Sequence, residues 1–286
     1  MAIVADVPFQ ELQERGWHVQ PRSFYWPLNN LSFLRENPDL WRRKSIPRAI
    51  DWDLDAQLDL VGEIAAFAPE LSDVPERGSG ERGSFAWDRG ALGKVDAIAY
   101  YGIVRKLKPR RVAEVGAGTS SQVLKRAIRA NGGDTTVTLV EPYPRWQILG
   151  DLPPGWTLHE CILQRADLRI FEALEAGDIL FYDGSHCAGT GGDVNWMLFE
   201  IFPRLAPGVW IHFHDIFWPR DYPAEWIFNE GLSWNEQYLL QAFLMHNPAY
   251  AVRLTVGMLN EERQELMSKV VAGKRGGGSV WIEKAL

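Results

Sequence analysis

The stretch that decides the fold is VAEVGAGTS, residues 112–120. A short apolar run ends in Gly116-Ala117-Gly118, and two residues suited to begin a helix, Thr119 and Ser120, follow directly. Glycines at a strand end let the backbone turn sharply and approach a ligand closely. The helix behind them presents free backbone N–H groups. The stretch therefore predicts a strand, a ligand-binding loop and a helix.

Strands and helices are expected to alternate around this loop. The expected strands are residues 111–115, 136–141, 157–161, 178–183 and 209–214, and the expected helices are residues 94–106, 119–129, 145–149, 168–174 and 193–205. Such alternation is typical of a parallel sheet with helices on both faces. The tail differs, because a helix at 236–245 precedes two strands, 250–256 and 279–283, that have no strong crossover helix between them. We predict a Rossmann-like, doubly wound α/β sheet that is mostly parallel, with an antiparallel C-terminal hairpin at its edge.

The chain before residue 94 has a different character. It is rich in Trp and Pro, contains one good helix at 54–67, and has a Gly, Ser and charge cluster at 75–84 that is typical of a mobile loop. We expect residues 1–93 to form an extension and a substrate-side cap, and residues 94–286 to form the domain built around the glycine loop.

Composition limits the partners. A formal net charge of -7 argues against nucleic acid held by a broad basic surface. Two cysteines are too few for a disulfide framework. We see no signal peptide, and no run approaches the roughly 20 apolar residues that span a bilayer. We expect a cytoplasmic protein that acts on a small molecule without nucleic-acid or membrane partners, and the Trp-rich extension could support a homodimer.

The residues around the loop limit the class of ligand that it can bind. A dinucleotide site wants Gly-x-Gly-x-x-Gly, and Ser121 stands where the third glycine would be. Glu114 before the loop would repel a pyrophosphate and suits a cationic amino acid. Glu141, at the end of the second strand, can accept hydrogen bonds from two ribose hydroxyls. Together these residues favour a nucleoside joined to a cationic amino acid.

Residues 114–120 resemble motif I of class I S-adenosylmethionine-dependent methyltransferases, and Glu141 resembles their ribose-binding acid. The resemblance continues through residues 177–186. The segments 24–27 and 212–217, the latter with a His-x-His-Asp-Ile-Phe block, are similar to a little-characterised bacterial branch found near glycan and secondary-metabolite genes.

This resemblance implies S-adenosylmethionine as the cofactor, with Glu114, Gly116 and Gly118 near its methionine moiety and Glu141 on its ribose. The adenine is expected near Arg165-Ala166-Asp167. The cofactor-binding residues expected in full are Glu114, Gly116, Gly118, Thr119, Ser120, Glu141, Ala166, Asp167 and Asp183.

Ionisable residues follow the next two strands. Asp183 ends the fourth strand and precedes His186, and the fifth strand ends at His214-Asp215. Because both strands neighbour the first in a doubly wound sheet, their ends face the cofactor's reactive carbon. We therefore expect His186, His214 and Asp215 to be the catalytic residues. His212 and His214 lie on one face of the same strand, and one of the two suits a buried structural role.

Two mechanisms fit these residues. Asp183, His214 and Asp215 could bind a divalent metal ion that acidifies an acceptor hydroxyl, and a histidine ligand would suit Mn²⁺, Fe²⁺ or Zn²⁺ better than Mg²⁺. Alternatively, without a metal, His186 or His214 is the general base, since imidazole titrates near neutral pH. The sequence slightly favours the metal-free base.

The sequence does not identify the methyl acceptor. An aromatic stretch after the fifth strand suggests a substrate wall for a sugar or secondary metabolite, and the expected substrate residues are Tyr25, Trp26, Trp218, Tyr222 and Trp226. O-methylation of a hydroxyl is favoured. N-methylation of a small amine and a non-catalytic S-adenosylmethionine-binding module stay open as alternatives.

Overall fold

The computed structural model describes residues 9–19, 25–88, 92–265 and 277–286 of the 286-residue chain. In this part of the chain seven strands form one sheet, in the order β3-β2-β1-β4-β5-β7-β6. The strands are β1 (Arg111–Val115), β2 (Thr136–Val140), β3 (Trp156–His159), β4 (Ile179–Tyr182), β5 (Trp210–Phe213), β6 (Tyr250–Thr255) and β7 (Val280–Lys284).

The sheet has the predicted topology. Strands β1 to β5 are parallel, and β7 runs antiparallel to both β5 and β6. The mostly parallel, doubly wound sheet with a C-terminal antiparallel pair at its edge is therefore confirmed. The strand order reverses between β1 and β4, so a crevice opens at the carboxyl ends of these two strands, where such sheets bind ligands.

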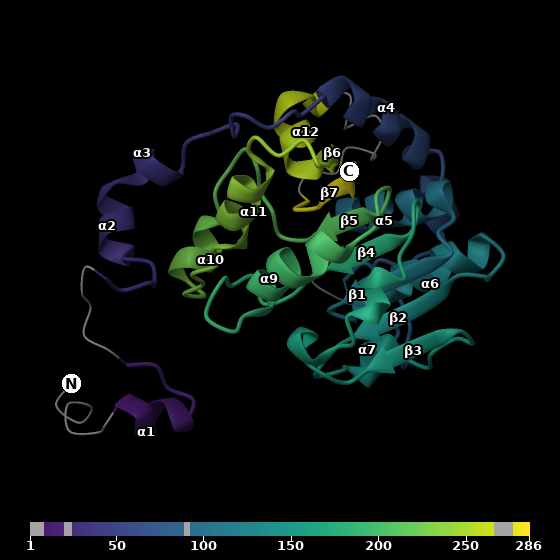
Figure 1. Cartoon of the computed structure of the whole chain (residues 1–286), viewed down its shortest axis with the longest axis horizontal. Coiled ribbons are helices and arrows are strands. Elements are labelled where there is room, and N and C mark those ends of the chain that lie inside the picture. Colours follow the sequence, from purple (N-terminus) through teal and green to yellow (C-terminus); the bar gives the residue numbers. More distant parts are fainter. Residues whose placement is uncertain (1–8, 20–24, 89–91, 266–276) are drawn as a thin grey trace.

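Helices cover both faces of the sheet (Figure 1). They are α4 (Leu54–Ala65), α5 (Lys94–Leu107), α6 (Thr119–Ala130), α7 (Trp146–Leu149), α8 (Arg169–Glu172), α9 (Asp193–Trp196), α11 (Glu236–Leu244) and α12 (Val256–Glu262). A further helix, α10 (Ala224–Phe228), contributes no residue to either core. The helical run begun by α9 continues as a π-helix, Met197–Ile201, and a 3-10 turn, Phe202–Arg204. Helices α10 and α12 were not predicted, because each is short and lies beside proline or strand-like sequence.

The alternation of side chains along β4 explains why two cores form. Ile179 and Phe181 face one core, where Phe181 stacks on Tyr100 of α5 with ring centroids 4.4 Å apart. Leu180 and Tyr182 face the other core, which α9 and α11 cover. All four residues are fully buried. A strand apolar on both sides is stable only between two helical layers.

Part of the predicted extension shares the first core. Leu60, Val61 and Ile64 of α4 are buried in the same cluster as α5. The glycine- and charge-rich loop at 75–84 lies against α7, where Gly83 N–H donates to the Gln147 carbonyl at 3.0 Å. Residues 54–88 therefore belong to the body of the molecule.

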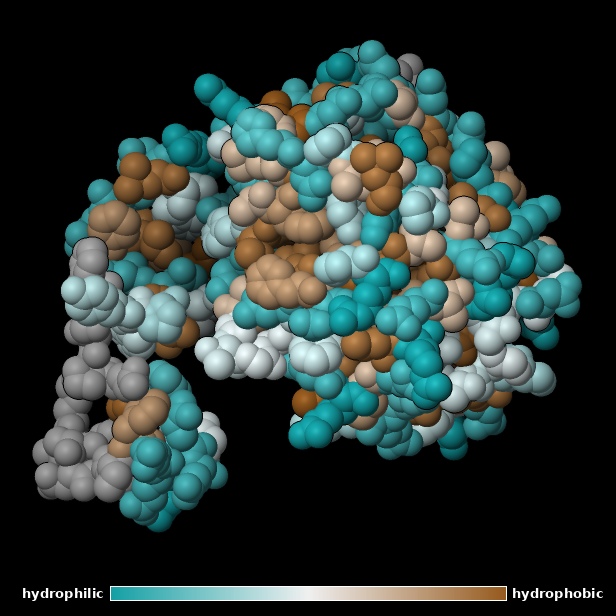
Figure 2. All heavy atoms as spheres, in the orientation of Figure 1, coloured by the Kyte–Doolittle hydropathy of each residue, from teal (hydrophilic) through white to brown (hydrophobic). Residues whose placement is uncertain are grey.

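Of the described residues before α4, those that carry the first three helices form an arm that reaches away from the body (Figures 1 and 2). Ser45 and Trp52 pack against the loop after β5. The arm carries α1 (Phe9–Glu14), α2 (Leu31–Glu36) and α3 (Pro38–Trp41), and none of these helices has a buried residue. It contacts the body beside α10, where the Trp41 and Phe228 rings lie 5.7 Å apart. Tyr25 on the arm is 90% exposed, and Trp26 is half-buried. The substrate role of these two residues stays a prediction.

Candidate active site

The glycine loop lies where β1 meets the end of β4. Gly116 has a left-handed backbone with φ of +87°, and a Cβ at this position would lie 2.0 Å from the Asp183 carbonyl oxygen. Both the turn and the close passage over β4 therefore require glycine. Gly118 is different, because its φ of −177° lies outside the left-handed region, and a Cβ there would lie 3.5 Å from Arg145 Nη2.

Glu114 lies beneath the loop and is fully buried. Its carboxylate accepts hydrogen bonds from Ser121 Oγ at 2.5 Å, Ser120 Oγ at 2.7 Å and Tyr100 OH at 3.2 Å. Burial raises the pKa of the Glu114 carboxyl to about 7, although the three hydroxyl donors oppose this rise. Glu114 was expected beside the methionine moiety of the cofactor. Its side chain instead ties the loop and the start of α6 to α5, and it does not line the cleft above.

Glu114→Gln is expected to change how stability depends on pH. The pKa of Glu114 is about 7 in the folded protein and 4.5 when unperturbed, so the folded state holds the proton more tightly. Wild-type stability from this group is therefore lost as the pH rises from about 5 to about 8, by on the order of 2–3 kcal/mol. Glutamine has no proton to lose, so the variant should gain that much relative to the wild type across the same range. Urea unfolding at the two pH values measures this, and equal differences at both would contradict it.

A cleft of about 190 Å³ opens above the loop. Its lining residues are Leu92, Gly116, Ala117, Gly118, Thr119, Ser120, Glu141, Arg145, Asp183 and Gly184. Most residues predicted to bind the cofactor are thus brought together. Glu141 lies beyond the end of β2, with its Oε1 accepting the Tyr143 N–H at 2.8 Å. Arg145 was missed, because one arginine in a loop has no distinguishing pattern.

Ala166 and Asp167 lie outside the lining of this cleft. Ala166 is buried, and Asp167 pairs with Arg169 through both carboxylate oxygens, at 3.0 and 2.9 Å. The hydrogen bonds from Arg169 lower the pKa of Asp167 to about 2. The adenine contact expected of Ala166 and Asp167 stays a prediction.

A larger cavity, of about 880 Å³, lies at the other end of the sheet, between α4 and β6. Trp210 at the start of β5 and Tyr250 at the start of β6 are among its lining residues, and no predicted site residue is. Because doubly wound sheets bind ligands at the carboxyl ends of their strands, the smaller cleft is the better cofactor site despite its size.

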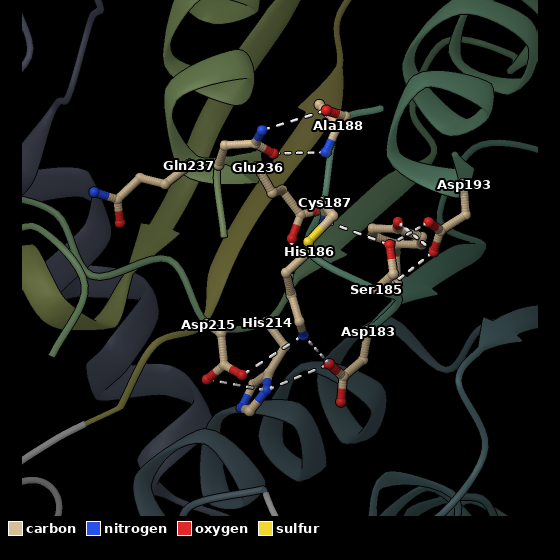
Figure 3. Close-up of polar contacts among 12 residues, drawn as sticks. Asp183, Ser185, His186, Cys187, Ala188, Asp193, His214, Asp215, Glu236 and Gln237 are labelled. Atoms are coloured by element: carbon tan, nitrogen blue, oxygen red, sulfur yellow. Dashed lines mark hydrogen bonds and ion pairs between the residues drawn. The ribbon is translucent and has the colours of Figure 1, made fainter. Parts of the chain in front are cut away.

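Beside the cleft, two histidines and two aspartates form a compact cluster (Figure 3). His186 Nε2 lies 3.2 Å from Asp183 Oδ1 and 3.7 Å from Asp215 Oδ2. His214 Nδ1 lies 3.5 Å from Asp215 Oδ1 and 3.7 Å from Asp183 Oδ1. The predicted catalytic residues therefore meet at the ends of β4 and β5.

His186 is held from behind by α11. Its Nδ1 lies 2.8 Å from Glu236 Oε2, and its carbonyl accepts the N–H groups of Asn235 and Glu236 at 3.1 and 3.2 Å. These bonds stabilise a left-handed backbone at His186, with φ of +59°. Sequence reasoning missed Glu236, which resembles any acidic residue in the first turn of a helix.

The cluster carries excess negative charge. Burial alone would lower the pKa of His186, but hydrogen bonds to Asp183 and Glu236 outweigh it and raise the pKa to about 10. Burial alone would also lower the pKa of His214. The neighbouring carboxylates of Asp183, Asp215 and Asp96 outweigh burial and raise that pKa. Four carboxylates thus surround two imidazoles, so the site stays anionic even when both histidines are protonated. Such a site is suited to a cation.

His212 belongs to the core and not to the cluster. Its ring stacks on Phe181 with centroids 4.0 Å apart, and its Nε2 lies 2.9 Å from Ser279 Oγ. Burial lowers the pKa of His212 to about 3, so the ring is neutral. Of the two histidines on this strand, His212 is therefore the one with a structural role.

Asp193 fixes the turn that joins Asp183 to His186. Its Oδ2 accepts the Ser185 N–H at 2.8 Å and the Tyr182 hydroxyl at 3.0 Å, and its Oδ1 accepts the Ser185 hydroxyl at 2.5 Å. A Cβ at Gly184 would lie 2.3 Å from Asp193 Oδ2, so the turn also requires that glycine. Asp193 begins α9 without capping it.

The aromatic stretch after β5 divides into core and surface. Trp218 is 2% exposed and contacts Trp52 with ring centroids 5.5 Å apart. Tyr222 is buried too, and its hydroxyl accepts the Gln237 N–H at 3.0 Å. Both residues were expected in the substrate wall, and the structure gives them packing roles because their rings point into the body.

A row of half-exposed aromatic side chains begins beside the His186 ring. Trp234 lies 4.2 Å from the His186 ring, Trp226 lies 5.2 Å from Trp234, and Phe217 lies 5.2 Å from Trp226, all between centroids. We call Phe217, Trp226 and Trp234 the aromatic wall. Only Trp226 was predicted. Trp234 was missed because it lies 20 residues beyond His214 in the sequence.

Asp183, His186 and Asp215 are the described residues best placed to hold a metal ion. One ligand atom from each lies within 4.8 Å of the others. The set predicted from the sequence had His214 in place of His186. The difference arises because the left-handed backbone at His186 turns its Nε2 toward the two aspartates, while Glu236 holds its Nδ1.

The comparisons with known proteins agree with this architecture. Residues 113–216, somewhat more than a third of the chain, match the family model described as a methyltransferase domain. An uncharacterized protein of Archaeoglobus fulgidus is 27% identical over 169 residues, which cover 57% of this chain and 76% of that protein.

Solved structures are more distant. The apo-structure of CmcI-N160 is 17% identical, covering 99% of this chain and 98% of that chain, with a TM-score of 0.43. The SAH-bound Podospora anserina methyltransferase PaMTH1 is 15% identical, covering 93% and 100%, also with a TM-score of 0.43.

The matched segment runs from β1 to the end of the cluster and contains the glycine loop. With the sheet order and the crevice at β1 and β4, it gives this part of the chain the features of a methyltransferase domain. Among the described residues, no helix has both the length and the apolar character that crossing a bilayer requires.

Proposed function

We propose that this enzyme methylates a hydroxyl group of a small ring-shaped molecule, held against the cluster of Asp183, His186 and Asp215. One observation carries the proposal: these three side chains converge within 4.8 Å beside the cofactor cleft, and Asp183 belongs to both cluster and cleft. An acceptor oxygen bound there would lie next to a methyl group presented from the cleft. Methyl transfer needs mainly such close, in-line placement.

The donor set also fits a divalent cation, which we propose as a cofactor. A ligating histidine usually donates its second ring N–H to a carboxylate, and Glu236 stands 2.8 Å behind His186 in that arrangement. The excess of carboxylates over imidazoles supplies the negative charge. A nitrogen ligand with two carboxylates favours Mn²⁺, Fe²⁺ or Zn²⁺ over Mg²⁺. Bound there, the cation would lower the pKa of an acceptor hydroxyl.

Different residues of the chain bind the cofactor and orient the acceptor. The loop from Gly116 to Ser120 and Glu141 bind S-adenosylmethionine in the cleft. The cluster orients the acceptor hydroxyl, and the Asp183 or Asp215 carboxylate accepts its proton as the oxygen bonds to the methyl carbon. The methyl–sulfur bond breaks in the same step, and S-adenosylhomocysteine leaves. With no cation bound, the surrounding carboxylates raise the pKa values of His186 and His214, which disfavours the alternative of a metal-free histidine base.

The aromatic wall favours a ring-shaped acceptor such as a sugar or a phenol. Its rings are half-exposed and begin at His186, so a flat molecule can stack on Trp234 or Trp226 while a hydroxyl reaches the cluster. Carboxylates can accept hydrogen bonds from neighbouring hydroxyls. An aliphatic amine would not use these rings as fully.

The test is a panel of sugars, phenols and amines with labelled S-adenosylmethionine. Transfer to oxygen is expected, lost on treatment with a chelator and restored by Mn²⁺ more effectively than by Mg²⁺. Transfer to nitrogen alone would overturn the hydroxyl acceptor. Full activity after rigorous chelation would overturn the cation and return the role to a histidine base. S-adenosylmethionine binding without transfer to any acceptor would favour a non-catalytic module.

A further inference from the structure

Asn29, which precedes α2 in the arm, makes two hydrogen bonds to the loop between α10 and α11. Its backbone N–H donates to Ser233 Oγ at 3.0 Å, and its Nδ2 donates to the Leu232 carbonyl at 3.0 Å. Asn29 is half-buried, whereas Leu28 and Asn30 on either side of it are exposed. Two bonds of ordinary length, across 204 and 203 residues of sequence, therefore join the arm to this loop.

The loop that Asn29 holds, residues 229–233, connects two members of the aromatic wall. Trp226 of α10 precedes the loop, and Trp234 follows it directly. The Leu232 N–H donates to the Trp226 carbonyl at 3.0 Å, so the same residue bonds to the arm and to the wall. The position of Trp234 thus depends on the path of the loop before it.

The tip of this loop is exposed. Asn229, Glu230 and Gly231 all face solvent, and a Cβ added at Gly231 would have no atom within 4 Å. Exposed loop tips are more mobile than the elements that they connect. The arm passes beside α10 (Figure 1), and the two bonds from Asn29 limit motion in the part of the loop that leads to Trp234.

We propose that Asn29 is a positioning residue that holds Trp234 against the His186 ring and so sets where the acceptor binds in the aromatic wall. The Trp234 and His186 ring centroids lie 4.2 Å apart, and an acceptor can stack there only if Trp234 keeps its place. Asn29 does not line the cofactor cleft or belong to the cluster, so we expect it to affect acceptor binding alone. The effect on the acceptor rests on the proposed function, whereas the position of Trp234 does not.

An Asn29 that only fastens the arm would have a different effect. The arm has further contacts with the body, since Trp41 packs on Phe228 and the Arg35 guanidinium lies 5.0 Å from the centroid of the same ring. If Asn29 were one more fastening of this kind, its loss would loosen the arm and leave the Trp234 ring where it is. The surroundings of Trp234 therefore distinguish the two roles.

The experiment is ¹⁹F NMR of the full chain labelled with 5-fluorotryptophan, with the Trp234 signal assigned by comparison with Trp234→Phe. Asn29→Asp keeps the size of the side chain but removes the N–H that faces the Leu232 carbonyl. The Trp234 signal should shift or broaden in this variant, and also in Ser233→Ala, which removes the acceptor of the second bond. An unchanged signal in either variant would overturn the proposal, and thermal melts verify that both fold.

Asn37→Asp is the matched control. The Asn37 Nδ2 makes the same kind of bond, to the Phe33 carbonyl at 2.9 Å, but both residues belong to the arm. The Trp234 signal should therefore stay as in the wild type. A change as large as that in Asn29→Asp would mean that any disturbance of the arm reaches Trp234, and would overturn the role given to Asn29.

With an acceptor in hand, Asn29→Asp should raise the KM for that acceptor by about 5- to 10-fold, the size expected for the loss of one hydrogen bond. Its kcat and its affinity for S-adenosylmethionine should stay within about twofold of the wild type. An unchanged KM with a shifted Trp234 signal would overturn the effect on the acceptor. Expected spectra without any methyl transfer would count against the proposed function alone, and transfer with unchanged spectra would count against Asn29 alone.

Discussion

Gly116→Ala is expected to weaken the binding of S-adenosylmethionine by about 100-fold. The backbone at Gly116 is left-handed, with φ of +87°, and an added Cβ would lie 2.0 Å from the Asp183 carbonyl oxygen. A left-handed non-glycine residue costs about 1–2 kcal/mol and forced overpacking about 1–3 kcal/mol, while each 1.4 kcal/mol is a tenfold change in affinity. The loop must therefore move away from the end of β4, and its residues no longer line the cleft as they do in the wild type.

Gly155→Ala is the matched control, because it adds a Cβ to another left-handed glycine, outside the cleft. Gly155 has a φ of +81°, and no atom lies within 4 Å of the added Cβ. We expect its affinity for S-adenosylmethionine to stay within about threefold of the wild type. Calorimetric titration with S-adenosylmethionine measures both variants, with thermal melts to verify folding. Equal losses in the two, or wild-type binding by Gly116→Ala, would contradict the position assigned to the loop.

Asp215→Asn is expected to lower kcat by about 100-fold or more, with little change in the affinity for S-adenosylmethionine. Asp215 contacts both histidines of the cluster, at 3.7 Å from His186 Nε2 and 3.5 Å from His214 Nδ1, and it does not line the cofactor cleft. Its φ is +57°, a conformation that asparagine tolerates, so the fold should persist. The variant removes one negative charge from the place where a cation and an acceptor hydroxyl would meet.

Asp221→Asn makes the same chemical change outside the cluster. Asp221 lies in the loop after β5 and accepts the Tyr238 hydroxyl at 2.5 Å and the Tyr222 N–H at 2.8 Å. Its kcat should stay within about threefold of the wild type. Steady-state rates with the acceptor found in the panel compare the two variants. A similar loss in both would mean that general loop disorder, and not the cluster, limits the rate.

The sheet and the glycine loop could be predicted because the information for them is local. An apolar run such as β4 can be stable only inside a sheet covered on both faces, and a strand that ends in Gly116-Ala117-Gly118 before a helix has few other uses. The strand ends then bring Asp183, His186, His214 and Asp215 to one edge through topology alone. Their convergence follows from the strand order and needs no knowledge of side-chain packing.

Partners that arrive through tertiary structure could not be predicted. Glu236 reaches His186 from α11, and Asp96 reaches His214 from α5, over sequence separations of 50 and 118 residues. In the sequence, each is an acidic residue in the first turn of a helix, where such residues are common. Only the packing of both helices against the sheet shows that their carboxylates are buried beside imidazoles.

The aromatic residues show the same limit. Trp218 and Trp226 occur in one stretch and have the same chemistry, yet the first packs on Trp52 in the core and the second belongs to the wall beside Trp234. Which way a ring points depends on the path of the loop after β5. The metal-ligand set expected from the sequence had His214 where the structure brings His186 closest to the two aspartates. The left-handed backbone at His186 that turns its ring toward them is stabilised by α11.

The most direct measurement is anomalous diffraction from crystals of the full chain grown with S-adenosylhomocysteine and Mn²⁺. S-adenosylhomocysteine is expected in the cleft above Gly116, with its ribose on Glu141, and an anomalous peak is expected among Asp183, His186 and Asp215. A ligand in the larger cavity between α4 and β6, or a saturating cation that leaves these three residues without a peak, would contradict the proposed site.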